Sequence, residues 1–274
     1  EAIQRLASED PCLDVEHRSN TNETVILGTG ELHLRLVLQA MKDRFGVEAE
    51  TRPPTIPYRE TITGRAEGHH RHKKQTGGAG QFGEVFLRIA PLPRGSGLEF
   101  ENAVVGGAIP SQFIPAVEKG VRQAMDEGAV AGFPLHDVKV TVYDGKFHSV
   151  DSKEVAFVAA GRKAVLDAIS KAGAIVLEPL IEMHVSAPVD ATGSVTGDLS
   201  SRRGRVLGST MLGAERVQID AEAPLAELQD YPSALKAMTG GSGTYTMALS
   251  RYEAVPARIQ QDLAAAAAGE AGTG

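Results

Sequence analysis

The clearest structural signal in the sequence begins at Ile181-Glu182-Met183-His184-Val185-Ser186-Ala187, a segment with the composition of a β-strand. From about residue 178 the pattern predicts the order strand, helix, strand, strand, helix, strand. The strands are expected near 181–187, 205–211, 215–221 and 244–250, and the helices near 189–202 and 224–237. This order is typical of a ferredoxin-like split βαβ domain, in which two helices cover one face of a four-stranded sheet.

A second α+β region precedes this domain, between residues 58 and 177. Residues 84–89 and 138–143 alternate between apolar and polar side chains, which predicts two half-buried strands. A helix is predicted over 111–126, where Pro115 is tolerated because it lies in the first turn.

The first 57 residues predict only part of a domain. Residues 24–27 have the composition of a strand, and a following helix with one apolar face is expected to end at Gly46. Residues 53–57 contain three prolines, which make a stiff connector and mark a domain boundary. Since the first residue already lies in a predicted helix, we expect the chain to be a fragment of a longer protein.

Two local patterns complete the expected organisation. Asp151 and Glu154 have the spacing of a capping box, which predicts the start of a helix. Residues 264–268 are all alanine and lie in a low-complexity end that is expected to fray. The chain is therefore expected to divide into residues 1–57, 58–177, 178–256 and a flexible tail, 257–274.

Composition and charge exclude several classes of protein. The 274 residues include 35 acidic and 28 basic side chains, which give a net charge of −7, and 42% of them are hydrophobic. Such a chain can form two or three cores, and its single cysteine, Cys12, cannot form an internal disulfide. No apolar run approaches the roughly 18 residues that span a bilayer. The acidity argues against a general nucleic-acid coat protein but allows one local basic site.

Residues 78–83, Gly-Ala-Gly-Gln-Phe-Gly, match the dinucleotide fingerprint G-x-G-x-x-G letter by letter. That fingerprint binds pyrophosphate only where a strand precedes it and a helix follows, and here a strand follows. Two interpretations remain open. The segment is either a flexible hairpin connection or a loop whose backbone approaches RNA or protein closely.

A basic, histidine-rich segment lies immediately before this loop, at His69-His70-Arg71-His72-Lys73-Lys74-Gln75-Thr76. It is either a solvated strand end or, together with the glycine-rich loop, a tip that binds phosphate. A metal site built from the three histidines is not expected, because no cysteine or carboxylate lies beside them at an obvious ligand spacing. The sequence also lacks a G-x-x-x-x-G-K-[ST] loop and a G-x-S-x-G elbow, so we find no catalytic centre.

Four further motifs occur in order along the chain: Gly28-Thr29-Gly30-Glu31-Leu32-His33-Leu34, Gln75-Thr76-Gly77-Gly78-Ala79-Gly80-Gln81-Phe82-Gly83, Tyr143-Asp144-Gly145-Lys146-Phe147-His148 and Gly197-Asp198-Leu199-Ser200-Ser201-Arg202-Arg203-Gly204. Together they resemble the C-terminal half of elongation factor G and its relatives, the translational GTPases, over about residues 1–256. The resemblance implies a multidomain α+β fold, with ferredoxin-like split βαβ units flanking an elongated, ribosomal-protein-like α+β domain. It assigns residues 1–57 to a partial third domain, 58–177 to the fourth and 178–256 to the fifth.

In this family the tip of the fourth domain enters the decoding region of the small ribosomal subunit, and the fifth domain contacts large-subunit rRNA. The resemblance thus implies a cytoplasmic, monomeric partner of the ribosome, tRNA and mRNA that binds no membrane. GTP and Mg²⁺ are expected in a domain N-terminal to this chain, and no cofactor or metal within it. The residues implied to contact the ribosome or its RNA are Lys73, Lys74, Gln75, Thr76, Gly77, Gly78, Ala79, Gly80, Gln81, Phe82, Gly83, Asp144, Gly145, Lys146, Phe147, His148, Arg202 and Arg203.

The leading functional hypothesis is therefore translocation of tRNA and mRNA by a GTPase of which this chain is the ribosome-engaging part. One residue departs from the family pattern, because Ala79 stands where elongation factor G typically has a positive residue. The departure resembles secondary paralogues, so ribosome disassembly with a recycling factor, or ribosome protection from antibiotics, are alternatives. A third reading is an unrelated RNA-binding module, which is disfavoured because the strands of 178–256 supply few aromatic side chains beyond Tyr245.

Overall fold

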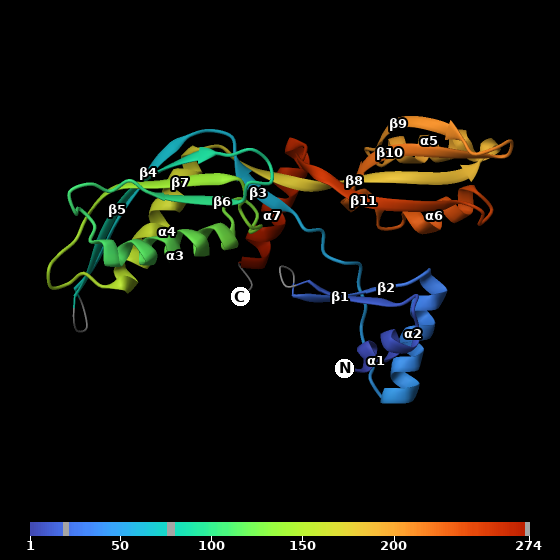
Figure 1. Ribbon diagram of the computed structural model, residues 1–274, viewed down its shortest axis with the longest axis horizontal. Coiled ribbons are helices and arrows are strands. Elements are labelled where there is room, and N and C mark those ends of the chain that lie inside the picture. The colour runs from blue at the N-terminus through green and yellow to red at the C-terminus, as the bar shows by residue number, and fades with distance from the viewer. Residues whose placement is uncertain (19–21, 76–79, 272–274) are drawn as a thin grey trace. The chain divides into compact units, whose positions relative to one another are not determined.

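The computed structural model describes residues 1–18, 22–75 and 80–271 (Figure 1). The chain forms two compact units, each of mixed α+β structure, as the sequence predicts. Unit 1 comprises Glu1–Pro57 and Pro179–Arg251, and unit 2 comprises Tyr58–Glu178 and Tyr252–Gly274.

The N-terminal part of unit 1 packs two helices with a two-stranded antiparallel sheet. Its elements are α1 (Ala2–Glu9), β1 (Asp14–Arg18), β2 (Glu23–Leu27) and α2 (Glu31–Phe45). Leu6 of α1 and Val37 and Met41 of α2 are buried in a common cluster. The predicted end of the helix is confirmed, because α2 stops at Gly46, whose φ of +66° is the left-handed conformation that glycine adopts readily at a helix end.

The C-terminal part of unit 1 has the predicted ferredoxin-like order. Its elements are β8 (Ala174–Pro188), η2 (Val189–Ala191), α5 (Thr192–Ser201), β9 (Arg205–Met211), β10 (Arg216–Pro224), η3 (Leu225–Leu228), α6 (Tyr231–Met238) and β11 (Thr244–Ala254). The strands lie in the order β11-β8-β10-β9, and β10 is antiparallel to both of its neighbours. Alternate residues such as Met183 and Ile219 are fully buried with Val195 and Leu199 of α5, which explains the period-two pattern of the strands.

Unit 2 contains a four-stranded sheet in the order β4-β5-β7-β6. Its elements are β3 (Arg59–Ile62), β4 (Ala66–Lys74), β5 (Gln81–Pro91), β6 (Leu98–Asn102), η1 (Ser111–Phe113), α3 (Ile114–Glu127), β7 (Val138–Lys146), α4 (Glu154–Lys171) and α7 (Ala257–Ala271). β6 and β7 are parallel and are joined through α3, whereas β5 is antiparallel to both β4 and β7. β3 pairs with residues 174–177 of β8.

The core of unit 2 lies between this sheet and the helices α3 and α4, which pack against each other (Figure 1). Val85 and Leu87 of β5 and Val140 of β7 are fully buried there. β4 approaches α4 closely at Gly68, where a Cβ atom would lie 2.0 Å from the backbone oxygen of Ala164. Glycine is therefore required at this position by packing.

The structure corrects two local predictions. The N-cap of α4 is Lys153 and not Asp151, and no side chain caps the helix. Asp151 is instead bound within the preceding turn, where its backbone oxygen accepts a hydrogen bond from the Phe82 N–H. The capping-box pattern therefore gave the right element, but it assigned the wrong role to the aspartate.

The expected flexible tail is helical as far as Ala271, as α7. Ile259, Leu263 and Ala267 recur every four residues and pack against the buried Val176 and Val255. Alanine has the highest helix propensity, so a helix with even a narrow apolar face is stable once it has a surface to pack on. Within the described residues neither α7 nor any other helix is both long and apolar enough to cross a bilayer.

Candidate nucleic-acid interface

The two segments predicted to form the tip converge at one end of the sheet of unit 2. β4 ends at Lys74 and β5 begins at Gln81, so the glycine-rich segment joins these paired strands. β7 ends beside them, because Lys146 pairs with Glu84 of β5. Of the predicted tip residues, Thr76, Gly77, Gly78 and Ala79 lie outside the described residues, and the others lie around this junction.

Hydrogen bonds hold the start of β5 to the turn between β7 and α4. The Phe82 N–H donates to the backbone oxygen of Asp151 at 2.9 Å, and the Ser152 hydroxyl donates to the Phe82 oxygen at 3.0 Å. The His148 N–H donates in turn to the Ser152 hydroxyl at 2.8 Å. Asp151 and Ser152 were not predicted to belong to the tip, although their hydrogen bonds connect the start of β5 with the turn that contains His148.

His148 is held by backbone groups of its own turn. Its Nδ1 accepts hydrogen bonds from the N–H groups of Val150 and Asp151, at 3.3 and 3.2 Å. Nε2 therefore carries the proton of the neutral ring and is the nitrogen that can donate to a ligand. The ring lies edge-on to Phe82, with centroids 6.3 Å apart, and 55% of the side chain is exposed. The Asp151 carboxylate lies 3.5 Å from Nδ1, so Nε2 is left to donate to a ligand, which suits recognition.

The tip exposes both positive charge and apolar surface. Lys73, Lys74 and Lys146 are exposed, and none of them forms an ion pair with another described residue. Phe147 is 46% exposed, so its ring is accessible to a ligand. Cations with an exposed aromatic ring are the groups that contact phosphates and bases in RNA.

The two strands around the tip approach each other through glycine. Gly145 of β7 is buried, and a Cβ atom there would lie 2.4 Å from the backbone oxygen of Glu84. At the start of β5, a Cβ atom on Gly80 would lie 2.5 Å from the Asp151 carboxylate. Asp144 is exposed, and its carboxylate accepts the Gly145 N–H at 2.8 Å. At Gly80 and Gly145 the backbone is thus packed too closely to leave room for a side chain.

The histidines of β4 do not converge. His69 Nε2 donates to the Glu84 carboxylate, 2.8 Å away, and His72 contacts the Gln81 side chain at 3.0 Å. His70 faces the helices, where burial, followed by the charge of Lys163, lowers its pKa. Within the described part of the chain, no group of three His, Cys, Asp or Glu side chains is placed to hold a metal ion.

The glycine-rich segment does not fit a nucleotide. After Gly80 the chain continues directly into β5, which begins at Gln81. A helix N-terminus, which would supply N–H groups and a positive dipole to a pyrophosphate, does not follow the glycines. No step of GTP chemistry is therefore assigned to these residues.

Arg202 and Arg203, predicted to contact rRNA or another domain, bind acidic groups of unit 1. Arg202 donates to the Asp198 carboxylate at 2.8 Å and to the Glu227 backbone oxygen at 2.7 Å, and only 13% of its side chain is exposed. Hydrogen bonds to Asp230 and Asp198 raise the pKa of Arg202. Arg203 has a φ of +58° and donates to the Glu227 carboxylate at 2.8 Å. The structure thus gives both arginines structural partners within unit 1.

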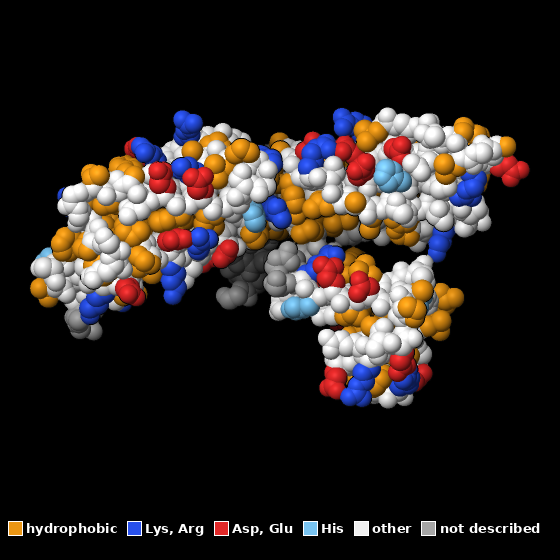
Figure 2. Space-filling model, in the orientation of Figure 1, with side chains coloured by type: hydrophobic (Ala, Val, Ile, Leu, Met, Phe, Trp, Pro, Cys, Tyr) orange, Lys and Arg blue, Asp and Glu red, His pale blue; other side chains and the backbone are white. Residues whose placement is uncertain are grey.

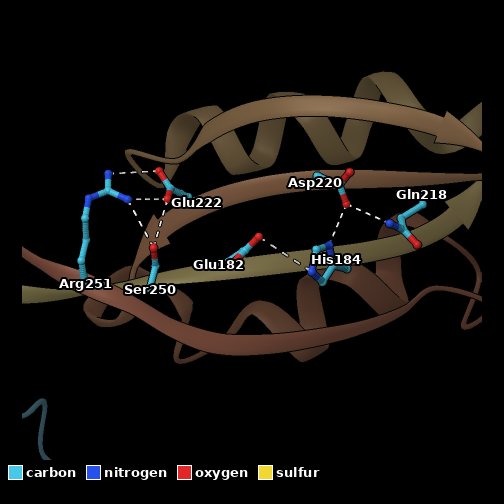
Figure 3. A network of polar contacts seen from close by, with 7 residues as sticks. All are labelled: Glu182, His184, Gln218, Asp220, Glu222, Ser250 and Arg251. Carbon is cyan, nitrogen blue, oxygen red and sulfur yellow. Dashed lines mark hydrogen bonds and ion pairs between the residues drawn. The ribbon is translucent and has the colours of Figure 1, made fainter.

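The sheet face of unit 1 that turns away from α5 and α6 carries a polar network (Figure 3). His184 contacts Asp220 at 2.7 Å, and hydrogen bonding to Asp220 raises the pKa of His184. Glu222 accepts hydrogen bonds from Arg251, which together with Arg205 lower its pKa to about 2 against the effect of burial. The aromatic Tyr245 is absent from this network, since it packs on the buried Tyr231 with centroids 5.4 Å apart. This face therefore does not offer the stacking surface of an RNA-recognition sheet.

Charged side chains of both signs are interspersed on the face of unit 2 drawn in Figure 2. Glu99 and Glu101 both contact Lys139, and Arg122 pairs with Glu118. The net acidity of the chain is thus compatible with local positive charge at the tip.

Three family models together match nearly the whole chain. Residues 1–53 match "Elongation Factor G, domain III", residues 54–173 match "Elongation factor G, domain IV", and residues 175–263 match "Elongation factor G C-terminus". The tip described above lies in the second of these regions, and Arg202 and Arg203 lie in the third.

Several curated relatives are similar to this chain over most of its length. The "Elongation factor G-like protein" of Thermotoga maritima is 45% identical over 95% of this chain and 38% of its own length. A protein of the same description from Mycobacterium tuberculosis is 48% identical over 93% of this chain and 36% of its own length. "Elongation factor G" of Paracoccus denitrificans is 47% identical over 96% of this chain and 37% of its own length. The chain thus spans between 36% and 38% of the length of these relatives.

A crystal structure of a protein from Thermus thermophilus has the same fold over 98% of this chain and 40% of its own length. The TM-score is 0.86, and the sequences are 41% identical.

Proposed function

The chain belongs to the elongation factor G family, and from this premise we propose that its unit 2 tip contacts the small ribosomal subunit while tRNA and mRNA are moved. The partners proposed are the decoding region, the tRNA–mRNA pair and, for residues 178–256, large-subunit rRNA. GTP hydrolysis with Mg²⁺ is assigned to residues outside this chain. The chain itself would transmit the resulting conformational change to the RNA.

One observation carries the proposal, namely the hydrogen-bonded junction that places Phe82 and His148 together at the end of the sheet. This junction fixes two segments that are distant in sequence at one edge of unit 2. The exposed lysines beside it supply phosphate contacts that need no base sequence. A hydrogen-bonded junction with a proton donor at His148 Nε2 suits a role in which force is applied to RNA without covalent chemistry.

A chimera tests this proposal directly. This chain replaces the matching residues of the Paracoccus denitrificans elongation factor G, with which it is 47% identical over 262 residues. Movement of mRNA on the ribosome is followed with and without His148→Ala, and Arg122→Gln on α3 serves as the control. We expect His148→Ala to slow GTP-dependent movement at least tenfold and the control to leave it unchanged. Equal movement by the chimera and its His148→Ala variant would refute the assignment of the tip.

Ala79 favours a second candidate function, because elongation factor G typically has a positively charged residue at this position and this chain has none there. In that case the same tip would enter the ribosome during subunit splitting, together with a ribosome recycling factor. The chimera then separates subunits when the recycling factor is added but supports little peptide synthesis. An Ala79→Lys variant that restores synthesis would assign the difference to this one charge.

A further inference from the structure

The sheet face of unit 2 that turns away from α3 and α4 carries aromatic and basic side chains. Side chains alternate along β5, so the buried Val85 and Leu87 point to the core while Phe86 and Arg88 lie on the opposite face. A β-bulge lies opposite this point, since Phe86 pairs with Asp144 and Leu87 pairs with Val142. The extra residue on β7 is Tyr143, which the bulge directs toward Phe86 and Arg88.

Three rings from three neighbouring strands form a row, here called the aromatic strip: His69 of β4, Phe86 of β5 and Tyr143 of β7. The rings of His69 and Phe86 are stacked, with centroids 4.1 Å apart and an interplanar angle of 18°. Phe86 and Tyr143 follow at 6.4 Å. The guanidinium of Arg88 lies 5.8 Å from the Tyr143 centroid. The strip is only partly buried, and 45% of the His69 side chain is exposed.

Glu84 fixes one end of the aromatic strip. Its Oε1 lies 2.8 Å from His69 Nε2 and 3.1 Å from Arg71, although the side chain itself is only 2% exposed. Burial acts to raise the pKa of Glu84, but the hydrogen bonds from Arg71 and His69 outweigh it and lower the pKa. Its Oε2 is buried and has no hydrogen-bond partner within the described residues.

Positive charge is available beside the aromatic strip toward the tip. Within the part of the chain that the structure describes, Lys73, Lys146 and Arg88 form no ion pair. At the far edge of the same face the charge is neutralised, because Lys139 is held by Glu99 and Glu101. Glu67 and Asp144 lie close to Tyr143, so a polyanion is attracted mainly to the end of the aromatic strip that Lys73 and Lys146 flank.

We propose that the aromatic strip binds a short segment of single-stranded RNA, with bases stacked on Tyr143 and on the face of Phe86 that His69 does not cover, and with phosphates near Lys73 and Arg88. Rings on adjacent strands, flanked by cations, are the arrangement by which β-sheets bind unpaired bases, because a base offers a π-face only when it is not inside a duplex. A protein partner would not need three aligned rings beside unpaired cations. The choice of RNA over DNA rests on the proposed ribosomal function. The assignment of a surface that stacks bases rests on the rings alone and is independent of that function.

Fluorescence anisotropy of a labelled twelve-nucleotide RNA of mixed sequence, titrated with the whole 274-residue chain, tests the stacking. Phe86→Leu keeps an apolar side chain but removes the ring, and it should weaken binding roughly 5- to 100-fold, the range for loss of one stacked base. Phe45→Leu, which removes a partly buried ring of α2 in unit 1, outside both the tip and the aromatic strip, is the matched control and should change affinity less than twofold. Binding of the Phe86→Leu chain at unchanged affinity overturns the proposal.

A second variant tests the charge without altering the core. For single-stranded RNA, each phosphate contact adds about 0.7 to the slope of log affinity against log salt. Arg88→Gln should reduce the slope by that amount, whereas Arg122→Gln on the helical side of unit 2 should leave it unchanged. Equal effects of both substitutions would mean general attraction and would overturn the proposal, as would equally tight binding of the same RNA in a duplex.

These results separate the aromatic strip from the proposed function of the tip. Failure of the chimera with intact oligonucleotide binding rejects only the role of the tip in translocation. Normal movement by the chimera, with no oligonucleotide binding by the chain, rejects only the aromatic strip.

Discussion

Among substitutions of Glu by Gln or Asp by Asn in unit 2, Glu60→Gln should lower the unfolding free energy most. Glu60 is fully buried, and its carboxylate accepts four backbone hydrogen bonds from the loop that follows α3. Oε2 accepts from Ala129 and Val130 at 2.6 and 2.9 Å, and Oε1 from Ala131 and Phe133 at 2.7 and 3.2 Å. Four N–H groups of the loop thus depend on one side chain for their hydrogen bonds.

The size of the effect follows from this geometry. Glutamine keeps one acceptor oxygen, and its NH₂ group would point at two N–H donors. Each hydrogen bond to a charged group contributes about 1.5–3 kcal/mol net, so two losses cost about 3–6 kcal/mol. Relief of the desolvation of a buried charge offsets part of this, which leaves about 2–4 kcal/mol. That is a large share of the roughly 5–15 kcal/mol that stabilises a domain.

Urea unfolding followed by circular dichroism measures the change in free energy, and hydrogen exchange at residues 129–133 localises it. Glu118→Gln is the matched control, because Glu118 is a surface residue of α3 paired with Arg122 and should contribute only about 0.5 kcal/mol. If Glu60→Gln costs less than about 1 kcal/mol, or exchange at 129–133 is unaltered, the carboxylate does not hold the loop and the reasoning is wrong.

Three further outcomes are expected. Arg202→Gln should lower the unfolding free energy of unit 1 by about 1–3 kcal/mol in urea, because buried acceptors lose a charged donor, while the salt slope of RNA binding stays constant. The pKa of His184, raised by Asp220, should lie above about 6.5 by NMR titration and fall in Asp220→Asn. The charged pair then stabilises unit 1 fully below that pH, and the contribution is lost as the pH rises through the raised pKa. Gly68→Ala should cost about 3 kcal/mol in the same urea assay, since its Cβ would overlap the Ala164 oxygen; an unchanged midpoint would contradict the close packing.

The order of elements in residues 178–256 could be predicted because the alternation of core residues is a local property. Strand length could not. β8 begins at Ala174, seven residues before the segment that the pattern marks, because residues 174–177 pair with β3. That pairing joins residues more than one hundred positions apart, and no local window contains both. The helix α7 was missed for the same reason, since its packing partner Val176 is far away in the sequence.

The candidate site divides in the same way. The glycine-rich loop and Lys146–His148 segment were identified by motif, but their attachment through Ser152 depends on a bridge between β5 and the turn before α4. The aromatic strip was not predicted, because the three rings lie on three strands and two of them, His69 and Tyr143, stood in motifs interpreted otherwise. No sequence pattern predicted the β-bulge that places Tyr143 beside Phe86.

Local charge could have been predicted better than it was. Arg202 lies four residues after Asp198, the spacing at which helical side chains pair, so its neutralisation was visible in the sequence. Arg202 and Arg203 were predicted to contact the ribosome or its RNA, whereas the structure pairs both with carboxylates. The cations left for RNA are those near the tip, such as Lys73 and Lys146. Because the whole chain has a net charge of −7 and most of its surface repels phosphate, attachment should depend on this one region and weaken steeply with salt, which favours rapid release.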